Sequence, residues 1–225
     1  MTRESSVPGP GREQTKRRSR SRGWRFVVPA LAIGAVLAVL FRATLFDVFS
    51  IGSGSMEPTL TAGDRILVNR LAADEIQHSD VVVFDGTGTL APYRSPDPVR
   101  DLLKALRLTG HDEYFVKRVI GLPGDTISCC TADGELTRNG RILEEEYVAA
   151  DGPASDLEFE VTVPSDRLWL LGDHRSASAD SRALLGAPGG GMIPLDRVVG
   201  RVDKIVWPLD RAGDIDENTS PHVRQ

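Results

Sequence analysis

The chain contains one long apolar segment, which restricts its N-terminal part to very few structures. Residues 26–41 are uncharged and mostly apolar, and the apolar character resumes after Arg42. Residues 24–46 make 23 positions, about 35 Å as a helix, which is enough to cross the hydrocarbon core of a bilayer. Crossing requires Arg25 and Arg42 to extend their charged ends toward water. The sequence therefore predicts a transmembrane helix at 24–46.

Charge is divided unequally around this segment. Residues 1–25 carry eight Lys and Arg against two Glu, a net charge of +6, while the other 200 residues carry 19 basic and 30 acidic side chains, a net of −11. Basic residues next to an apolar segment usually stay in the cytoplasm. We therefore expect residues 1–23 to be a disordered basic cytoplasmic tail, with residues 47–225 outside. The acidic remainder argues against nucleic-acid binding.

A cleaved signal peptide has the same order of basic and apolar residues. A small-residue triplet, Ala30-Leu31-Ala32, resembles a cleavage motif, but it lies at the start of the apolar run. Cleavage sites follow the apolar run. The sequence therefore favours a retained signal anchor.

The pattern after residue 46 is that of short antiparallel strands. Asp133-Gly134 and Asn139-Gly140 are two-residue turn sequences that join neighbouring strands. We predict a mainly β chain: a single N-terminal transmembrane helix, then an antiparallel β catalytic domain at 47–208 with an inserted β-hairpin subdomain at about 125–167. An acidic C-terminal tail follows at 209–225. The strands are expected near 47–51, 65–70, 80–84, 158–163, 168–171 and 198–207, with the last strand of the chain at 198–207 and an amphipathic helix near 97–106.

The cysteines and histidines give no metal pattern. Cys129 and Cys130 are adjacent, whereas zinc ligands come in spaced pairs, and the four histidines have no ligand spacing. We predict no metal and no cofactor. A disulfide between the two neighbours remains an alternative, but two half-buried thiols on opposite faces of a strand are favoured.

Two segments carry residues for nucleophilic chemistry. Ser53-Gly54-Ser55-Met56-Glu57-Pro58-Thr59-Leu60 is a serine-rich turn just beyond the apolar run, and Lys117 lies inside the apolar stretch 114–120. Full burial can lower a lysine pKa by about 3–5 units from about 10.4, so that a neutral amine can take a serine proton. Each segment alone is weak evidence for nucleophilic chemistry, because such turns are common and most lysines are exposed.

A third segment, residues 172–182, alternates acidic and basic residues. Its sequence Gly-Asp-His-Arg-Ser-Ala-Ser-Ala-Asp-Ser-Arg suggests two ion pairs, Asp173 with Arg175 and Asp180 with Arg182. Such pairs would hold a loop in a fixed shape.

Four segments of the chain resemble the four soluble sequence boxes of bacterial type I signal peptidases, in the same order after an anchor. They are the serine-rich turn at 53–60, Gly63-Asp64-Arg65-Ile66-Leu67-Val68, Lys117-Arg118-Val119-Ile120-Gly121-Leu122-Pro123-Gly124-Asp125 and the segment 172–182. The resemblance implies a membrane-bound serine endopeptidase that cleaves signal peptides from exported preproteins, beside the bilayer and near the export channel. It implies Ser55 as nucleophile and Lys117 as general base. It further implies the Ser53 hydroxyl and Ser55 N–H as the oxyanion hole, Ser178 as the group that orients the lysine, and structural roles for Met56, Arg118, Asp173, Asp180 and Arg182.

One position departs from the family pattern, and three alternatives remain. The family usually has asparagine where His174 lies, which raises a Ser55–His174 pair as an alternative chemistry; we favour a tolerated replacement. A self-cleaving repressor-type protease would have a DNA-binding domain in place of the apolar segment. An inactive membrane adaptor would lack the serine or the lysine, and both are present.

Overall fold

The computed structural model describes residues 24–92, 114–150, 152–215 and 222–223. The chain divides into two units, residues 1–42 and 43–225. The tail predicted at 1–23 and the amphipathic helix predicted near 97–106 lie outside the described residues.

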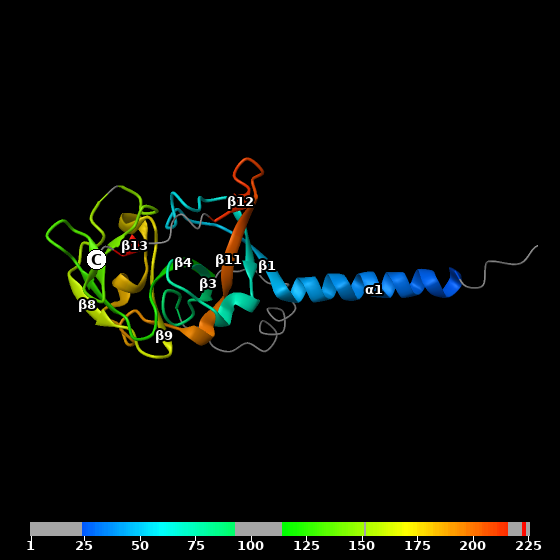
Figure 1. Ribbon diagram of the computed structural model, residues 1–225, viewed down its shortest axis with the longest axis horizontal. Helices are drawn as coiled ribbons and strands as arrows, with labels where there is room; N and C mark the ends of the chain where they lie inside the picture. The colour runs from blue at the N-terminus through cyan, green and yellow to red at the C-terminus, as the bar shows by residue number, and fades with distance from the viewer. Residues whose placement is uncertain (1–23, 93–113, 151, 216–221, 224–225) are drawn as a thin grey trace, which may run out of the picture. The chain divides into compact units, whose positions relative to one another are not determined.

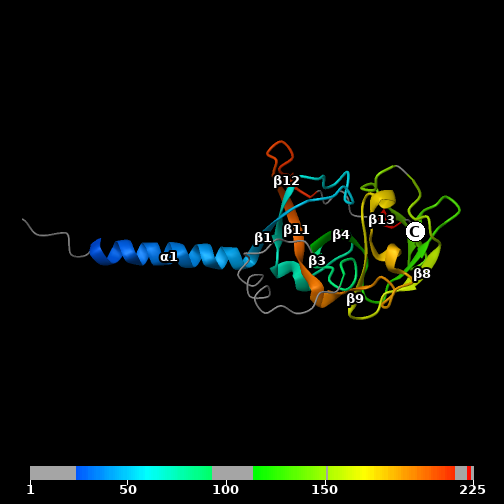
Figure 2. The ribbon, with the colours of Figure 1, turned by 180° about the vertical axis from the view of Figure 1, so that it is seen from behind.

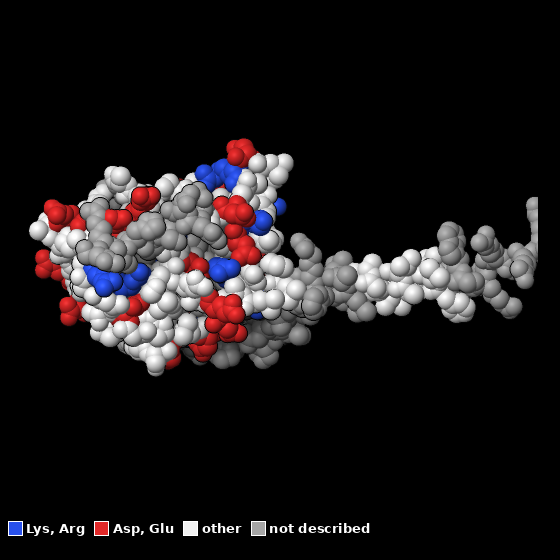
Figure 3. All heavy atoms as spheres, in the orientation of Figure 1, with Lys and Arg blue, Asp and Glu red and all other residues white. Residues whose placement is uncertain are grey.

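The apolar segment forms one helix, α1 (Trp24–Leu45), which ends one residue before the predicted boundary. Its described side chains are uncharged (Figure 3). Those of Phe26, Leu31 and Ile33 are all more than half exposed. Within the described residues, no helix reaches the combined length and hydropathy of a membrane span.

The second unit consists mainly of short strands. Figures 1 and 2 show β1 on one side of this unit and β8 on the other. The strands are β1 (Phe46–Ser50), β2 (Arg65–Asn69), β3 (Val81–Asp85), β4 (Tyr114–Gly121), β5 (Thr126–Cys129), β6 (Leu136–Arg138), β7 (Arg141–Glu144), β8 (Phe159–Thr162), β9 (Arg167–Leu171), β10 (Ile193–Pro194), β11 (Val198–Trp207), β12 (Gly213–Asp214) and β13 (His222–Val223). The 3₁₀ turns are η1 (Leu71–Asp74), η2 (Arg175–Ala177), η3 (Ser181–Leu184) and η4 (Leu195–Arg197).

Eight of these strands form the larger sheet. Its order is β1-β2-β11-β3-β4-β9-β10, with β12 pairing to β11. Each ladder among the described strands is antiparallel, so the prediction of a mainly antiparallel β fold is confirmed. Strand β9 pairs with β4 only from Arg118 onward, which leaves the first half of β4 beside the serine turn.

The smaller sheet has the order β13-β7-β6-β5-β8. Strands β5 to β8 fall inside the segment predicted as a hairpin subdomain, and the two Gly-containing turns join neighbouring strands as expected. Ile127 and Leu136 from this sheet share a core with Trp169 and Leu171 from the larger one. Because all four side chains are fully buried, the two sheets stabilise each other through one apolar layer.

Two short strands follow β11, so the expectation that 198–207 is the last strand is wrong. Strand β12 extends the larger sheet, and β13 pairs with Leu143 and Glu144 of β7. The segment expected as an acidic tail, 209–225, therefore contributes to both sheets. A two-residue strand has no periodicity that a sequence pattern can reveal.

Gly200 of β11 lies next to Asn69 of β2. A Cβ at this position would overlap the Asn69 carbonyl group, which is backbone and cannot move aside. We predict that Gly200→Ala lowers the free energy of unfolding by about 1–3 kcal/mol, the usual range for overpacking. Gly213→Ala is the matched control, because a Cβ at Gly213 meets nothing within 4 Å. Denaturant unfolding of both variants tests this, and equal midpoints would contradict it.

Candidate active site

The serine turn belongs to a closed loop between β1 and β2. Ile51 N–H donates to the Asp64 carbonyl at 2.8 Å, and Gly63 N–H donates to the Ile51 carbonyl at 2.9 Å. Met56 is 1% exposed and packs into the core beneath the loop. With Met56 buried, the loop keeps Ser55 half-buried and Ser53 exposed.

Lys117 approaches this loop from β4. Its side chain is 3% exposed, and Nζ donates a hydrogen bond to Ser55 Oγ at 2.6 Å. Burial lowers the pKa of Lys117 to about 8, and the carboxylates of Asp180 and Asp173 oppose a larger fall. A serine hydroxyl in contact with an amine of this pKa is an arrangement in which the amine can act as a general base.

The two other predicted serines also lie here. Ser53 Oγ is 3.4 Å from Ser55 Oγ and donates toward it. Ser178 Oγ is buried and has no hydrogen-bond partner among the described residues, and it packs against the Cα of Gly172. A Cβ at Gly172 would overlap both Ser178 Oγ and the Ser55 carbonyl oxygen, so glycine permits this close approach. The structure thus brings Ser53 and Ser178 to the site without a bond from Ser178 to Lys117.

Arg118, the next residue on β4, forms a buried ion pair. Its Nε and Nη2 donate to Asp173 Oδ1 and Oδ2 at 2.8 and 2.6 Å, and both side chains are at most 2% exposed. Thr59 Oγ1 donates to the same carboxylate at 2.6 Å, which joins the serine loop to the pair. The guanidinium also lies 3.9 Å over the Tyr147 ring. Such bidentate contacts satisfy charges that burial would otherwise destabilise.

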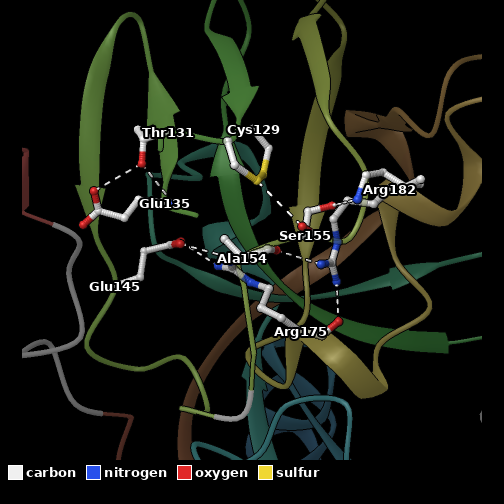
Figure 4. The surroundings of a disulfide bond; sticks show 10 residues. Cys129, Thr131, Glu135, Glu145, Ala154, Ser155, Arg175 and Arg182 are labelled. Atoms are coloured by element: carbon white, nitrogen blue, oxygen red, sulfur yellow. Dashed lines mark hydrogen bonds and ion pairs between the residues drawn. A yellow bond between two sulfur atoms is a disulfide. The ribbon is translucent and has the colours of Figure 1, made fainter. Parts of the chain in front are cut away.

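A second pair fixes the turn that carries Ser178. Arg182 Nε and Nη2 donate to Asp180 at 2.9 and 2.7 Å, as predicted, and Gly172 N–H donates to Asp180 Oδ2 at 3.0 Å. The other predicted pair, Asp173 with Arg175, is wrong. Asp173 binds Arg118, and Arg175 binds Glu145 at 2.9 and 2.6 Å (Figure 4). Asp173 and Arg175 point in different directions, so alternation in sequence did not identify the partners of these two residues.

The favoured assignment of the cysteines is also wrong. Cys129 and Cys130 are joined by a disulfide, and Cys130 Sγ lies 3.7 Å from the Ser155 carbonyl oxygen (Figure 4). Within the described ranges, His, Cys, Asp and Glu form no group of three or more that would hold a metal.

His174 contacts the serine loop through its backbone and its ring. Its N–H donates to the Ser55 carbonyl at 3.2 Å, and its Nδ1 lies 3.2 Å from the Gly54 carbonyl oxygen. The ring nitrogen therefore meets the peptide group before Ser55, whereas the Ser55 hydroxyl meets Lys117.

A cleft of about 520 Å³ opens beside these residues. It runs between β1 and the first half of β4, and Ser53, Ser55 and Lys117 lie on its wall together with Ile51 and Val116. Much of its remaining surface is apolar. An extended peptide can lie in such a cleft with a backbone carbonyl close to Ser55 Oγ.

Sequence reasoning missed three side chains that support the site: Thr59, Glu145 and Tyr147. Thr59 lies inside the serine turn, so its hydroxyl was visible in the motif, although its partner Asp173 is 114 residues away. Glu145 is one of three consecutive glutamates, and the sequence gives no reason to select it. Tyr147 was missed because nothing in the sequence points to its ring stacking on Arg118.

Comparison with known proteins assigns the family. The model of the family described as "Signal peptidase, peptidase S26" matches residues 24–207. The probable signal peptidase I of Mycobacterium leprae is 34% identical over 236 residues, covering 88% of this chain and 81% of the relative. The signal peptidase I of Mycobacterium tuberculosis H37Rv is 36% identical, covering 84% and 76%. That of Bacillus amyloliquefaciens is 34% identical, covering 78% and 84%.

The chain therefore belongs to the signal peptidase family, peptidase S26. It is a hydrolase of the serine-type peptidase class, and the resemblance read from its four sequence boxes is confirmed. A crystal structure of a signal peptidase I from Enterococcus faecalis is similar at 24% identity with a TM-score of 0.38, over 56% of this chain and 95% of that one.

The Arg118–Asp173 pair should contribute strongly to stability. We predict that Asp173→Asn lowers the free energy of unfolding by about 3–5 kcal/mol, because it leaves a buried guanidinium without its counter-charge. Asp214→Asn is the control: its pair with Lys204 is 3.1 Å long but exposed, so the loss should stay under about 1 kcal/mol. Calorimetric or denaturant unfolding of both variants gives the comparison. Similar losses in the two variants would contradict the role assigned to Asp173.

Proposed function

We propose that this protein is a membrane-anchored signal peptidase I that removes N-terminal signal peptides from exported preproteins with a Ser55–Lys117 dyad. The observation that carries the proposal is the 2.6 Å contact between Lys117 Nζ and Ser55 Oγ, with the amine buried and its pKa lowered to about 8. Family membership supports the choice of substrate, because the relatives are named signal peptidase I.

In this mechanism neutral Lys117 removes the Ser55 proton as Oγ attacks the scissile carbonyl carbon. The C–N bond of the tetrahedral intermediate then breaks, and the protonated amine of Lys117 delivers its proton to the leaving nitrogen. Lys117 next activates a water molecule, which hydrolyses the ester between Ser55 and the signal peptide. The Ser55 N–H and the Ser53 hydroxyl stabilise the oxyanion, and one such donor contributes about 3–4 kcal/mol. Ser178, whose buried hydroxyl has no hydrogen-bond partner in the described part of the chain, orients the Lys117 amine once substrate is bound.

The substrate lies extended in the cleft between β1 and β4. Val48 and Ser50 line it on one side and Val116 on the other, so each wall can offer backbone groups to an added strand. Alternate side chains of such a peptide enter the same wall. The family resemblance implies a preference for small residues at the first and third positions before the cut, whose side chains would enter that wall.

We further propose that α1 is the membrane anchor. The apolar run, its basic flank and the exposed apolar side chains of Phe26, Leu31 and Ile33 support this assignment. Residues 1–23 are then cytoplasmic, and the β domain lies outside, next to the lipid bilayer and the export channel from which preproteins emerge. Signal peptides end at the same surface, so an anchored site needs no long substrate segment to reach it.

The alternatives receive less support. A Ser55–His174 pair would need a ring nitrogen on Ser55 Oγ, whereas Nδ1 contacts the Gly54 carbonyl. An inactive adaptor would have no reason to keep a buried lysine in contact with a serine, since burying an amine lowers stability.

Removal of either dyad member should abolish processing. We expect Ser55→Ala and Lys117→Ala each to lower kcat by about 10⁴-fold or more, with the double variant little worse, because residues that act as one unit are not additive. Ser53→Ala should lose about 10²–10³-fold, since the Ser55 N–H remains. The assay is cleavage of a model preprotein by purified full-length chain, with unfolding curves for each variant. Full activity in a folded Ser55→Ala or Lys117→Ala variant would rule out the dyad.

The pH profile separates lysine from histidine. Because only neutral Lys117 can accept the serine proton, kcat/KM should rise about tenfold per pH unit below the pKa and level off above about 8. A histidine base with an ordinary pKa would give a rise centred near 6.5. His174→Asn discriminates further, because it should keep the alkaline rise. A profile already flat above pH 7 would contradict Lys117 as base.

A further inference from the structure

The peptide group between Gly54 and Ser55 is held by two hydrogen bonds on its carbonyl side. The Gly54 carbonyl accepts from Glu57 N–H at 3.1 Å and lies 3.2 Å from His174 Nδ1. A carbonyl oxygen has no hydrogen to give, so Nδ1 must carry the proton in this contact. His174 therefore donates to the peptide group that contains the nucleophile's own N–H.

The orientation of this carbonyl fixes the orientation of the N–H. The cis peptide bonds of the described residues lie elsewhere, so the Gly54–Ser55 bond is trans, and its N–H points opposite to its C=O. With the carbonyl directed at His174 and Glu57, the Ser55 N–H is directed away from them. It donates to no described residue, which leaves it available to a ligand in the cleft that Ser55 lines.

His174 also bonds the peptide group that follows Ser55. Its backbone N–H donates to the Ser55 carbonyl at 3.2 Å. One residue thus bonds the carbonyl groups on both sides of Ser55, and rotation of the Gly54–Ser55 peptide plane would break the ring contact. A hydrogen bond on a carbonyl oxygen also polarises its peptide group, which makes the attached N–H a stronger donor.

We propose that His174 is a positioning residue whose Nδ1–H aims the Ser55 N–H at the oxyanion of the tetrahedral intermediate. The inference rests on the proposed function, because it concerns the oxyanion site of that reaction. His174 does not touch the reacting atoms and takes no proton from Ser55. It acts by limiting the Gly54–Ser55 peptide to the orientation that the transition state needs.

The covalent structure of the side chain identifies the matched variants. Nδ1 of histidine and Nδ2 of asparagine are both attached to Cγ, so asparagine carries an N–H donor at the same position. Leucine has a methyl group there and no donor, with nearly the same shape as asparagine. His174→Asn therefore keeps the proposed interaction, and His174→Leu removes it. His174→Phe keeps the ring and also lacks the donor.

The test compares these variants as purified full-length chains with a fluorogenic signal-peptide substrate. We expect His174→Leu to lower kcat about tenfold or more with KM unchanged, a part of the 10²–10³-fold lost when an oxyanion donor is removed outright. His174→Asn should keep most of kcat. A peptide boronate, which forms a tetrahedral adduct on serine, should bind His174→Leu more weakly by the same factor as kcat/KM falls. Active-site titration and unfolding midpoints are measured alongside, and His174→Phe replaces His174→Leu if the latter does not fold.

The outcomes separate this inference from the proposed function. An inactive wild type, or an active folded Ser55→Ala variant, refutes the Ser55–Lys117 mechanism. If wild type is active and Ser55→Ala is not, wild-type kcat in His174→Leu overturns the role of His174 alone. Equal losses in His174→Asn and His174→Leu also overturn it, because the donor would then be irrelevant. A further outcome is that His174→Leu lowers the fraction of titratable sites or the unfolding midpoint while kcat per site stays at the wild-type value. That result overturns the positioning role and assigns His174 a structural role only.

Discussion

The site depends first on one buried ion pair, Arg118 with Asp173. The pair joins three segments that are distant in sequence: β4 through Arg118, the segment after β9 through Asp173, and the serine loop through Thr59. Removing two charges from water is unfavourable, so the pair is stable only because each charge is saturated by short contacts and by the Tyr147 ring. These same contacts set the distance between the lysine strand and the serine loop.

Lys117 and Arg118 are consecutive on β4, and both are buried. Successive side chains of a strand point to opposite faces, so the strand carries a cation into each of two buried layers. The two cations meet different surroundings. Arg118 has a carboxylate in direct contact and keeps its charge, whereas Lys117 has only more distant carboxylates and a serine hydroxyl, and burial lowers its pKa. The groups in contact with each side chain therefore decide that Arg118 is a structural cation and Lys117 a candidate base.

Much of this fold follows from local sequence. Strands 65–70, 80–84 and 198–207 and the two Gly-containing turns were predictable because alternation and turn residues act over a few positions. Ser55 and Lys117 were predictable as candidates because they stand in unusual local contexts. The partners of Asp173 and Arg175 were not, since ion pairing depends on which loops meet in space. The disulfide between Cys129 and Cys130 was also missed, because adjacent cysteines in a strand pattern leave both states open. The short strands β12 and β13 exist only through their partners β11 and β7.

The sequence separations within the site have a consequence for when activity arises. Ser55 and Lys117 are 62 residues apart, and Thr59 and Asp173 are 114 apart. Contacts over such separations form late, because the chain must first lose the entropy of closing long loops. A partly synthesised or partly folded chain has the serine but neither its amine nor the ion pair that holds the two together. Completion of the β domain is therefore the step that brings the serine and the lysine together.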